Sequence, residues 1–151
     1  MYVRIIFSPT TLTYAYENQN SPDVRIVDRH PGNMRKSSAQ ARPSILIAKS
    51  NRHLTLFVGS SPLRQYPVAI GKAATPTPSG NYAIATKILR PGGVLGTRWM
   101  GLNYDSYGIH GTSSPWLIGK MVSNGCIRMH NHNAEELFSL IHVGTPVYIR
   151  D

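Results

Sequence analysis

The fold class is decided by the stretch ILIAKSNRHLTLFVGSSPLRQYPVAI, residues 45–70. A short apolar run at 45–48 is followed by a polar turn at 49–52. In residues 54–58, Leu54, Leu56 and Val58 then alternate with Thr55 and Phe57. Alternation with a period of two predicts a half-buried strand. A second turn at 59–62 and a further apolar stretch at 66–70 complete the pattern of a β-meander.

The segments that follow extend the β pattern. Residues 73–80, AATPTPSG, predict a rigid loop, because Pro76 and Pro78 lack the N–H group that a sheet ladder needs. Further short strands are predicted at 81–88, 99–102, 107–110 and 146–150.

One helix is predicted, at residues 133–142. Asn133 is placed as its N-cap, and Glu136 three residues later completes a capping-box pattern. The apolar residues at 134, 137, 138 and 141 form one stripe, and Gly144 ends the segment. The chain is therefore predicted to be mainly β, with one short helix packed outside.

The first 43 residues differ in character from the rest. Residues 1–30 alternate weakly, with Leu12, Tyr14 and Tyr16 on one expected strand face and Val24 and Ile26 in a similar pattern. Residues 31–44, PGNMRKSSAQARPS, are polar and basic and predict a linker. We therefore expect an N-terminal segment at 1–43 and a domain at 44–151. No stretch has the pattern of a signal peptide or of a membrane span.

Charge narrows the classes of function. The 151 residues include 16 Lys and Arg against 7 Asp and Glu, for a net charge of +9, and no acid stands between Arg29 and Tyr104. A glycosidase needs two facing carboxylates, and a Mg²⁺ or Ca²⁺ site needs several. The few acidic residues of this chain therefore disfavour both functions. The basic residues are scattered singly, which favours anionic partners such as a wall polymer or a carboxylate-rich peptide over specific nucleic-acid binding.

The single cysteine, Cys126, excludes an internal disulfide framework and a multi-cysteine metal site. It leaves a buried thiol, a nucleophile, or a link to another chain. His110 lies 16 residues upstream and could act as a base for the thiol. Gly125 would let a substrate approach the backbone, and Arg128 would point to the same side of a strand as Cys126. A zinc site that combines Cys126 with His110, His130 and His132 is the alternative, and no ligand spacing supports it.

The stretch YGIHGTSSPWLIGKMVSNGCIRMHN, residues 107–131, resembles the active-site signature of the L,D-transpeptidases of the YkuD family. In that family His-Gly-Thr is followed by Ser-x-Gly-Cys-x-Arg. The resemblance extends in order through residues 45–57, 66–82 and 90–102, and so covers about residues 44–151. It implies the family's mixed-sheet β-sandwich with one short α-helix.

The resemblance also implies roles for individual residues. Cys126 matches the nucleophile, His110 the base, and the carbonyl of Gly111 the group that orients the imidazole. The backbone N–H groups of Asn124, Gly125 and Cys126 match the oxyanion hole. The substrate-binding residues are expected to be Arg128, Tyr107, Trp99 and Ser123. Two departures stand out: many members have histidine where this chain has Asn124, and residues 1–42 do not resemble the LysM module of bacillus-type relatives.

The implied activity is acyl transfer in peptidoglycan. The Cys126 thiolate would attack the carbonyl of the third residue in a tetrapeptide stem and release D-Ala. Transfer to an amine would then form a 3→3 cross-link. The alternatives are an L,D-carboxypeptidase or wall hydrolase with the same site, and a non-catalytic binder of anionic wall polymers. No metal or organic cofactor is implied, carbapenem-type inhibitors are expected to bind, and the expected location is the cell envelope.

Overall fold

The computed structural model describes residues 5–8, 11–14 and 42–151, and the chain divides into two compact units, Met1–Arg42 and Pro43–Asp151. In the first unit, β1 (Ile5–Ser8) pairs antiparallel with β2 (Thr11–Tyr14). The patterns noted at 24–26 and 31–41 lie outside the described residues.

The second unit is built on one mixed sheet of eight strands in the order β11-β9-β8-β7-β12-β3-β4-β5. β12 pairs parallel with β3 and antiparallel with β7, and β11 pairs parallel with β9. A small second sheet joins β6 (Ile70–Gly71) to β10 (Met121–Ser123), and short 3-10 turns lie at Gly93–Leu95 and Pro115–Leu117. The eight strands are β3 (Pro43–Ala48), β4 (His53–Val58), β5 (Ser61–Pro67), β7 (Gly80–Leu89), β8 (Arg98–Leu102), β9 (Gly108–His110), β11 (Ile127–Arg128) and β12 (Pro146–Arg150).

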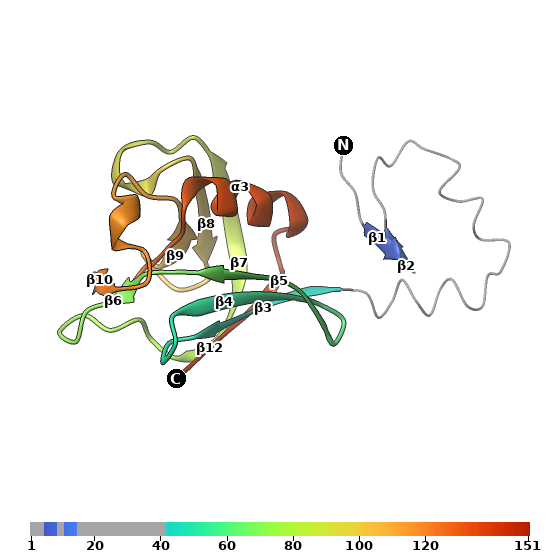
Figure 1. Cartoon of the computed structure of the whole chain (residues 1–151), viewed down its shortest axis with the longest axis horizontal. Helices are drawn as coiled ribbons and strands as arrows, with labels where there is room; N and C mark the ends of the chain where they lie inside the picture. The colour runs from blue at the N-terminus through green and yellow to red at the C-terminus, as the bar shows by residue number, and fades with distance from the viewer. Residues whose placement is uncertain (1–4, 9–10, 15–41) are drawn as a thin grey trace, which may run out of the picture. The chain divides into compact units, whose positions relative to one another are not determined.

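The long strand β7 joins the two halves of this sheet. Its first residues, Gly80–Ala83, pair with β12, and its later residues, from Ile84 on, pair with β8. The register shifts between Ile84 and Thr86, where one strand carries an extra residue. Such a bulge bends a strand and allows it to pass from one layer to the next. Figure 1 shows β7 running from the layer of β3, β4, β5 and β12 to the layer of β8 and β9.

The two ends of the sheet meet at one point. Ala69 follows β5 at one end of the strand order, and Arg128 lies in β11 at the other end. The amide of Ala69 donates to the carbonyl of Arg128 at 2.9 Å, and the amide of Arg128 donates back at 3.0 Å. The sheet therefore curls until its edges touch, and the predicted mixed-sheet, mainly β fold is confirmed.

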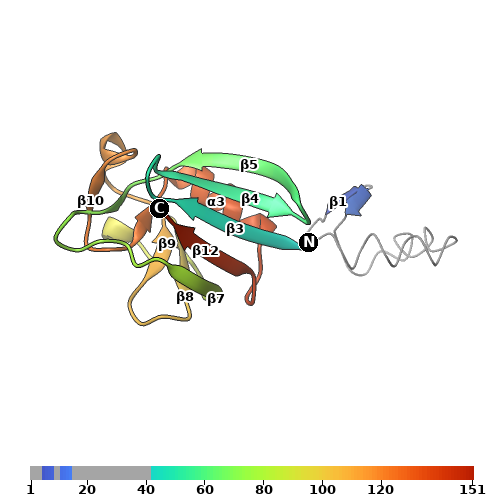
Figure 2. The ribbon, with the colours of Figure 1, turned by 90° about the horizontal axis from the view of Figure 1, so that it is seen from below.

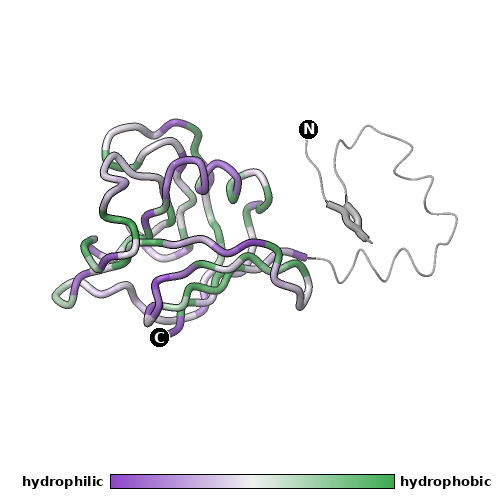
Figure 3. The backbone as a smooth tube through the Cα atoms, in the orientation of Figure 1, coloured by the Kyte–Doolittle hydropathy of each residue, from purple (hydrophilic) through white to green (hydrophobic). Residues whose placement is uncertain are grey.

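The interior of the curled sheet is filled by apolar side chains. Alternate residues of β3 and β4, Ile45, Ile47, Leu54 and Leu56, are fully buried, as the alternation in the sequence predicts. Apolar residues of β8, β9, β11 and β12 meet them from the other strands. Figure 2 shows β5, β4, β3 and β12 side by side, and Figure 3 shows hydrophobic segments along the strands and a hydrophilic start of α3.

The helix α3 spans Asn131–Leu140, so it begins and ends two residues before the predicted bounds. The capping-box prediction is wrong: the N-cap is His130, without a side-chain cap bond, and Asn133 lies inside the helix. The reason lies in tertiary contacts. Glu136 accepts hydrogen bonds from the Tyr66 hydroxyl at 2.7 Å and from Arg64 at 3.2 Å instead of turning back to the helix start.

Tyr66 fastens the helix to the sheet. It is buried in β5, and burial together with the Glu136 carboxylate raises the pKa of its hydroxyl, which therefore remains a donor. Replacing Tyr66 by Phe removes a hydrogen bond to a charged acceptor, and we expect unfolding free energy to fall by about 1–2 kcal/mol. Urea denaturation measures this change. Tyr148→Phe, at a half-exposed tyrosine, is the matched control and should change stability by less than about 0.5 kcal/mol. Equal losses in both variants would contradict the assigned role.

Candidate active site

The parallel pairing of β9 with β11 brings the predicted catalytic residues together. Ile127 stands opposite Ile109, and Arg128 stands opposite His110. Both isoleucines are fully buried in the core, so His110 and Arg128 share the other face of the sheet. Cys126 precedes Arg128 by two residues and lies on that same face.

His110 is held as a neutral imidazole. Its ring is 4% exposed, and Nδ1 lies 2.6 Å from the carbonyl oxygen of Gly111. Because a carbonyl oxygen only accepts, Nδ1 carries the proton and Nε2 is left as the acceptor. Burial lowers the pKa of His110 to about 4, against the raising effect of the Gly111 hydrogen bond and with a further lowering by Arg128. The ring is therefore unprotonated at neutral pH.

Trp99 lies beside this imidazole. The two ring centroids are 5.7 Å apart with an interplanar angle of 25°. A side chain on Gly108 would collide with the indole, so the glycine lets Trp99 lie close to β9. Trp99 therefore packs against the imidazole, and the substrate contact expected of it stays a prediction.

The thiol of Cys126 is also neutral at rest. Sγ donates to the carbonyl of Ser106 at 3.4 Å. Burial raises the pKa of the thiol, while the backbone of Gly108 and the charge of Arg128 lower it in part. Together with the lowered pKa of His110, this favours a neutral thiol and imidazole over a standing ion pair. The thiolate expected from the sequence is therefore not the resting form of Cys126.

The loop at 123–126 presents the thiol. Gly125 has a φ of 122°, a region that disfavours a side chain, and a Cβ there would collide with the ring of Tyr107. Tyr107 stacks in turn on Tyr104, with centroids 5.0 Å apart. The Tyr107 ring is therefore packed against the loop directly before Cys126.

Two expectations for this loop need correction. Ser123 is 2% exposed, and its hydroxyl donates to the carbonyl of Cys126 at 2.6 Å, so it shapes the loop and is buried away from a substrate. The amide of Gly125 donates to the same hydroxyl at 3.0 Å and is thereby withdrawn from an oxyanion hole. Within the described part of the chain, the backbone amides of Asn124 and Cys126 donate to no protein acceptor, and the oxyanion role expected of them stays a prediction.

The polar loop after β6 is hydrogen-bonded to the loop at 123–126, which carries Cys126. The buried hydroxyl of Thr77 accepts from the amide of Gly71 at 2.9 Å and donates to the carbonyl of Gly125 at 2.8 Å. Thr75 donates to the carbonyl of Ser123 at 2.9 Å. The sequence predicted a rigid loop here, and it gave no sign that its threonines would hold the cysteine loop.

Asn131 is a residue that sequence reasoning missed. Its Oδ1 accepts from the amides of Thr97 at 3.2 Å and Thr112 at 3.0 Å, and its Nδ2 donates to the carbonyl of Thr112 at 3.0 Å. Each threonine follows a glycine, Gly96 or Gly111, whose added Cβ would collide with Oδ1. Asn131 therefore fixes the segment that carries the Gly111 carbonyl and, through it, the ring of His110. The repeated Gly-Thr pair was the one signal in the sequence.

This arrangement predicts the effect of Asn131→Ala. Loss of its hydrogen bonds should cost roughly 2 kcal/mol of stability and loosen the segment after His110. Because the low pKa of His110 depends on burial, its NMR titration midpoint should move up from about 4 towards the ordinary value. Asn133→Ala, two residues along the same helix, is the control and should leave the midpoint unchanged. A destabilised variant with an unmoved midpoint would make Asn131 a merely structural residue.

The remaining candidate residues do not gather into a metal site. Rings of His130 and His132 stack on each other at the start of α3, 5.7 Å apart. Among the described residues, no three His, Cys, Asp or Glu side chains are placed to hold a metal ion. No helix of the described chain has the length and apolarity needed to cross a membrane.

Comparison with known proteins agrees with this geometry. The family model of the L,D-transpeptidase catalytic domain, YkuD, matches residues 42–149. YkuD of Bacillus subtilis is 44% identical over 105 residues, which are 70% of this chain and 64% of that protein. The chain therefore spans less than two thirds of that relative's length.

Solved structures give the same fold. The catalytic domain of the E. faecium L,D-transpeptidase superposes with a TM-score of 0.64 at 23% identity, covering 73% of this chain and 98% of that one. LdtMt1, solved in complex with imipenem, superposes with a TM-score of 0.61 at 21% identity, covering 72% and 58%. By its family match over residues 42–149, this chain belongs to the L,D-transpeptidase (YkuD) family.

Proposed function

We propose that the chain is a peptidoglycan L,D-transpeptidase that works through a cysteine acyl-enzyme. The observation that carries the proposal is the shared face of β9 and β11, on which a neutral His110 and the Cys126 thiol lie with Arg128. The substrate would be a tetrapeptide stem, cut at the carbonyl of its third residue. Membership of the family supports this activity, and the cell envelope is the location that it requires.

The first half of the reaction is acylation. Nε2 of His110 takes the thiol proton as Sγ attacks the carbonyl carbon, and a C–S bond forms while the carbonyl oxygen becomes an oxyanion. The amides of Asn124 and Cys126 are the candidate donors to that oxyanion. The imidazolium then gives its proton to the nitrogen of D-Ala as the C–N bond breaks. The Gly111 carbonyl keeps the ring in the tautomer that this transfer needs.

The second half is transfer to an acceptor. An amine from a second stem loses a proton to His110 and attacks the thioester, the C–S bond breaks, and the thiol is restored. With water as the acceptor, the same site would act as an L,D-carboxypeptidase. A non-catalytic binder of anionic wall polymers has no need of a neutral histidine and a thiol on neighbouring strands, and this pairing of strands supports an enzyme.

The proposal predicts the products from a disaccharide-tetrapeptide. Mass spectrometry should show release of D-Ala, a cross-linked dimer, and a transient acyl adduct on the intact protein. Because Cys126 is the single cysteine of the chain, Cys126→Ala should abolish all three signals. A carbapenem should add its mass to the wild type and leave this variant unmodified.

The outcomes separate the alternatives. Tripeptide without dimer would assign the carboxypeptidase. Retained binding to isolated cell walls without any adduct would assign the polymer binder. Undiminished turnover in Cys126→Ala would reject the nucleophile itself.

The neutral pair also predicts the pH dependence of acylation. His110 must be unprotonated to act as the base, and its pKa is lowered to about 4, so kcat/KM should fall on the acid side only near that pH. The raised pKa of Cys126 keeps the thiol protonated through neutrality, so the rate should stay flat above about pH 5 until the thiol ionises. Initial acylation rates followed by intact mass measure the profile. An acid limb at the ordinary histidine pKa near 6.5 would contradict the buried, neutral base.

A further inference from the structure

The side chain of Lys72 is tied to the nucleophile loop. Lys72 directly follows β6, and its amide donates to the carbonyl of Ser123 at 3.0 Å. Its Nζ donates to Oδ1 of Asn124 at 3.1 Å, two residues before Cys126. Thr75 and Thr77, in the same loop, hold the neighbouring carbonyls of the nucleophile loop. The position of the ammonium group is therefore fixed relative to the thiol at both its main chain and its tip.

The charge of Lys72 is available to a ligand. In the described part of the chain, the ion pairs join Lys49 to Asp151 and Arg64 to Glu136, and Lys72 is in neither. The side chain is exposed, and an ammonium group has three donors, of which one is used by Asn124. Because the side-chain oxygen Oδ1 of Asn124 accepts from Lys72, the side-chain nitrogen Nδ2 points away from the ammonium group. Nδ2 is therefore a further donor. A cation and free N–H groups together are what a carboxylate binds.

The position of Lys72 relative to the Cys126 thiol indicates on which side of the scissile bond the carboxylate lies. Arg128 stands opposite His110 on one flank of Cys126, and Lys72 reaches the other flank through Asn124. The leaving amine must lie near His110, which supplies its proton, and hence on the Arg128 side. Lys72 therefore faces the part of the substrate that stays bound as the acyl group.

We infer that Lys72, oriented by Asn124, forms a binding subsite for a peptide carboxylate on the acyl side of the scissile bond. The identity of the substrate rests on the proposed function, whereas the anion site itself does not. In a stem peptide, the carboxylate concerned belongs to a residue on the N-terminal side of the scissile bond. Lys72 is then a specificity-determining residue that favours stems in which this carboxyl is not amidated.

The anion site can be tested without any peptidoglycan. Iodoacetate and iodoacetamide alkylate the same thiol and differ in charge, and Cys126 is the one thiol of the chain. Lys72→Met should lower the ratio of the iodoacetate rate to the iodoacetamide rate roughly threefold, the size expected of an exposed charge pair. Lys72→Arg should keep the ratio, and added salt should reduce the wild-type ratio by screening.

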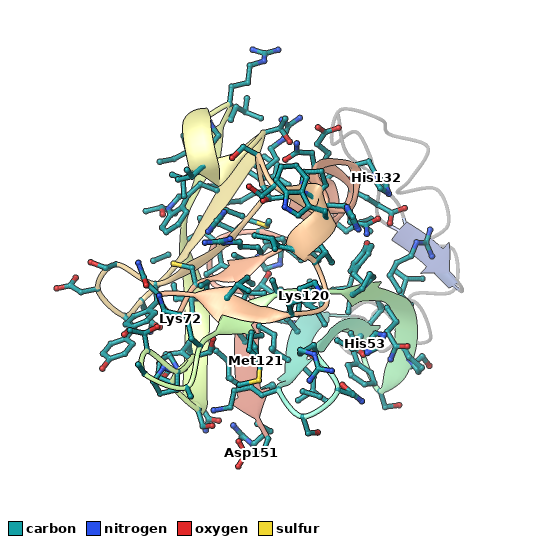
Figure 4. The ribbon with its side chains drawn as sticks, turned by 60° about the vertical axis from the view of Figure 1, so that its left-hand side comes forward. His53, Lys72, Lys120, Met121, His132 and Asp151 are labelled. Carbon is teal, nitrogen blue, oxygen red and sulfur yellow. The ribbon has the colours of Figure 1, made fainter. Side chains whose placement is uncertain are left out.

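Lys120→Met is the matched control. Lys120 is also exposed, and Figure 4 labels it on the same face as Lys72 and apart from it. The ratio of the iodoacetate rate to the iodoacetamide rate in Lys120→Met should equal that of the wild type. If Lys72→Met slows both reagents by the same factor, Lys72 only holds the loop. If Lys120→Met lowers the ratio as much, the effect belongs to the general positive charge of the domain. Either result overturns the site.

The assignment to the acyl side needs two peptides. One is a tetrapeptide stem with a free carboxyl on the acyl side of the scissile bond, and the other is the same stem with a carboxamide in place of that carboxyl. The wild type should release D-Ala faster from the free acid, and Lys72→Met should lose that preference while Lys120→Met keeps it. A preference that persists in Lys72→Met overturns the assignment. Failure of the wild type on both stems would reject the proposed function, and the alkylation ratios would still decide the anion site.

Discussion

The site depends on the register between β9 and β11. Only two residue pairs define it, and one of them, Ile127 with Ile109, is fully buried in the core. A slip by a single residue would turn Arg128 and Cys126 towards the core and expose Ile127. The cost of exposing that isoleucine and burying a guanidinium therefore fixes the face on which the chemistry occurs. The bridge from Ala69 to Arg128 secures the same strand from its other side.

Backbone carbonyl groups position several of the site's side chains and loops around this pair of strands. The carbonyl of Gly111 orients the imidazole, the carbonyl of Ser106 accepts a hydrogen bond from the thiol, and the carbonyl of Gly125 accepts one from Thr77. A chain with few acids can build a base in this way because a carbonyl dipole replaces the carboxylate partner of the histidine. It also keeps the site neutral at rest, so that the fixed charges nearby, Arg128 and Lys72, are both positive. Their positive charge agrees with the carboxylate-bearing substrate proposed for the site.

The sequence predicts those parts of the molecule whose cause is local. The apolar run at 45–48 and the alternation at 54–58 located β3 and β4, and the proline pair located the loop before β7. The two-residue strand β11 carries no periodicity, and its position follows from the core contact of Ile127. The helix start was misplaced because Glu136 binds Tyr66, 70 residues away, instead of the cap. Cys126 and His110 stood out through their motif, whereas Asn131 and Lys72 act through backbone or amide partners far along the chain, which no spacing in a single sequence reveals.

The crossover from β9 to β11 has a consequence for how such a site can vary. Two neighbouring parallel strands cannot be joined by a tight turn, so residues 111–126 form a long crossover connection between β9 and β11. This connection contains the 3-10 turn Pro115–Leu117, in which Trp116 is 71% exposed. Hydrogen bonds hold both ends of this connection: Asn131 bonds to the amide of Thr112, and Thr75 bonds to the carbonyl of Ser123. The separation of base and nucleophile along the chain is thus uncoupled from their separation in space. Insertions or deletions at 113–118, before the residues that pair with β6, lengthen or shorten a surface loop, and the positions of the imidazole and the thiol are still set by the sheet.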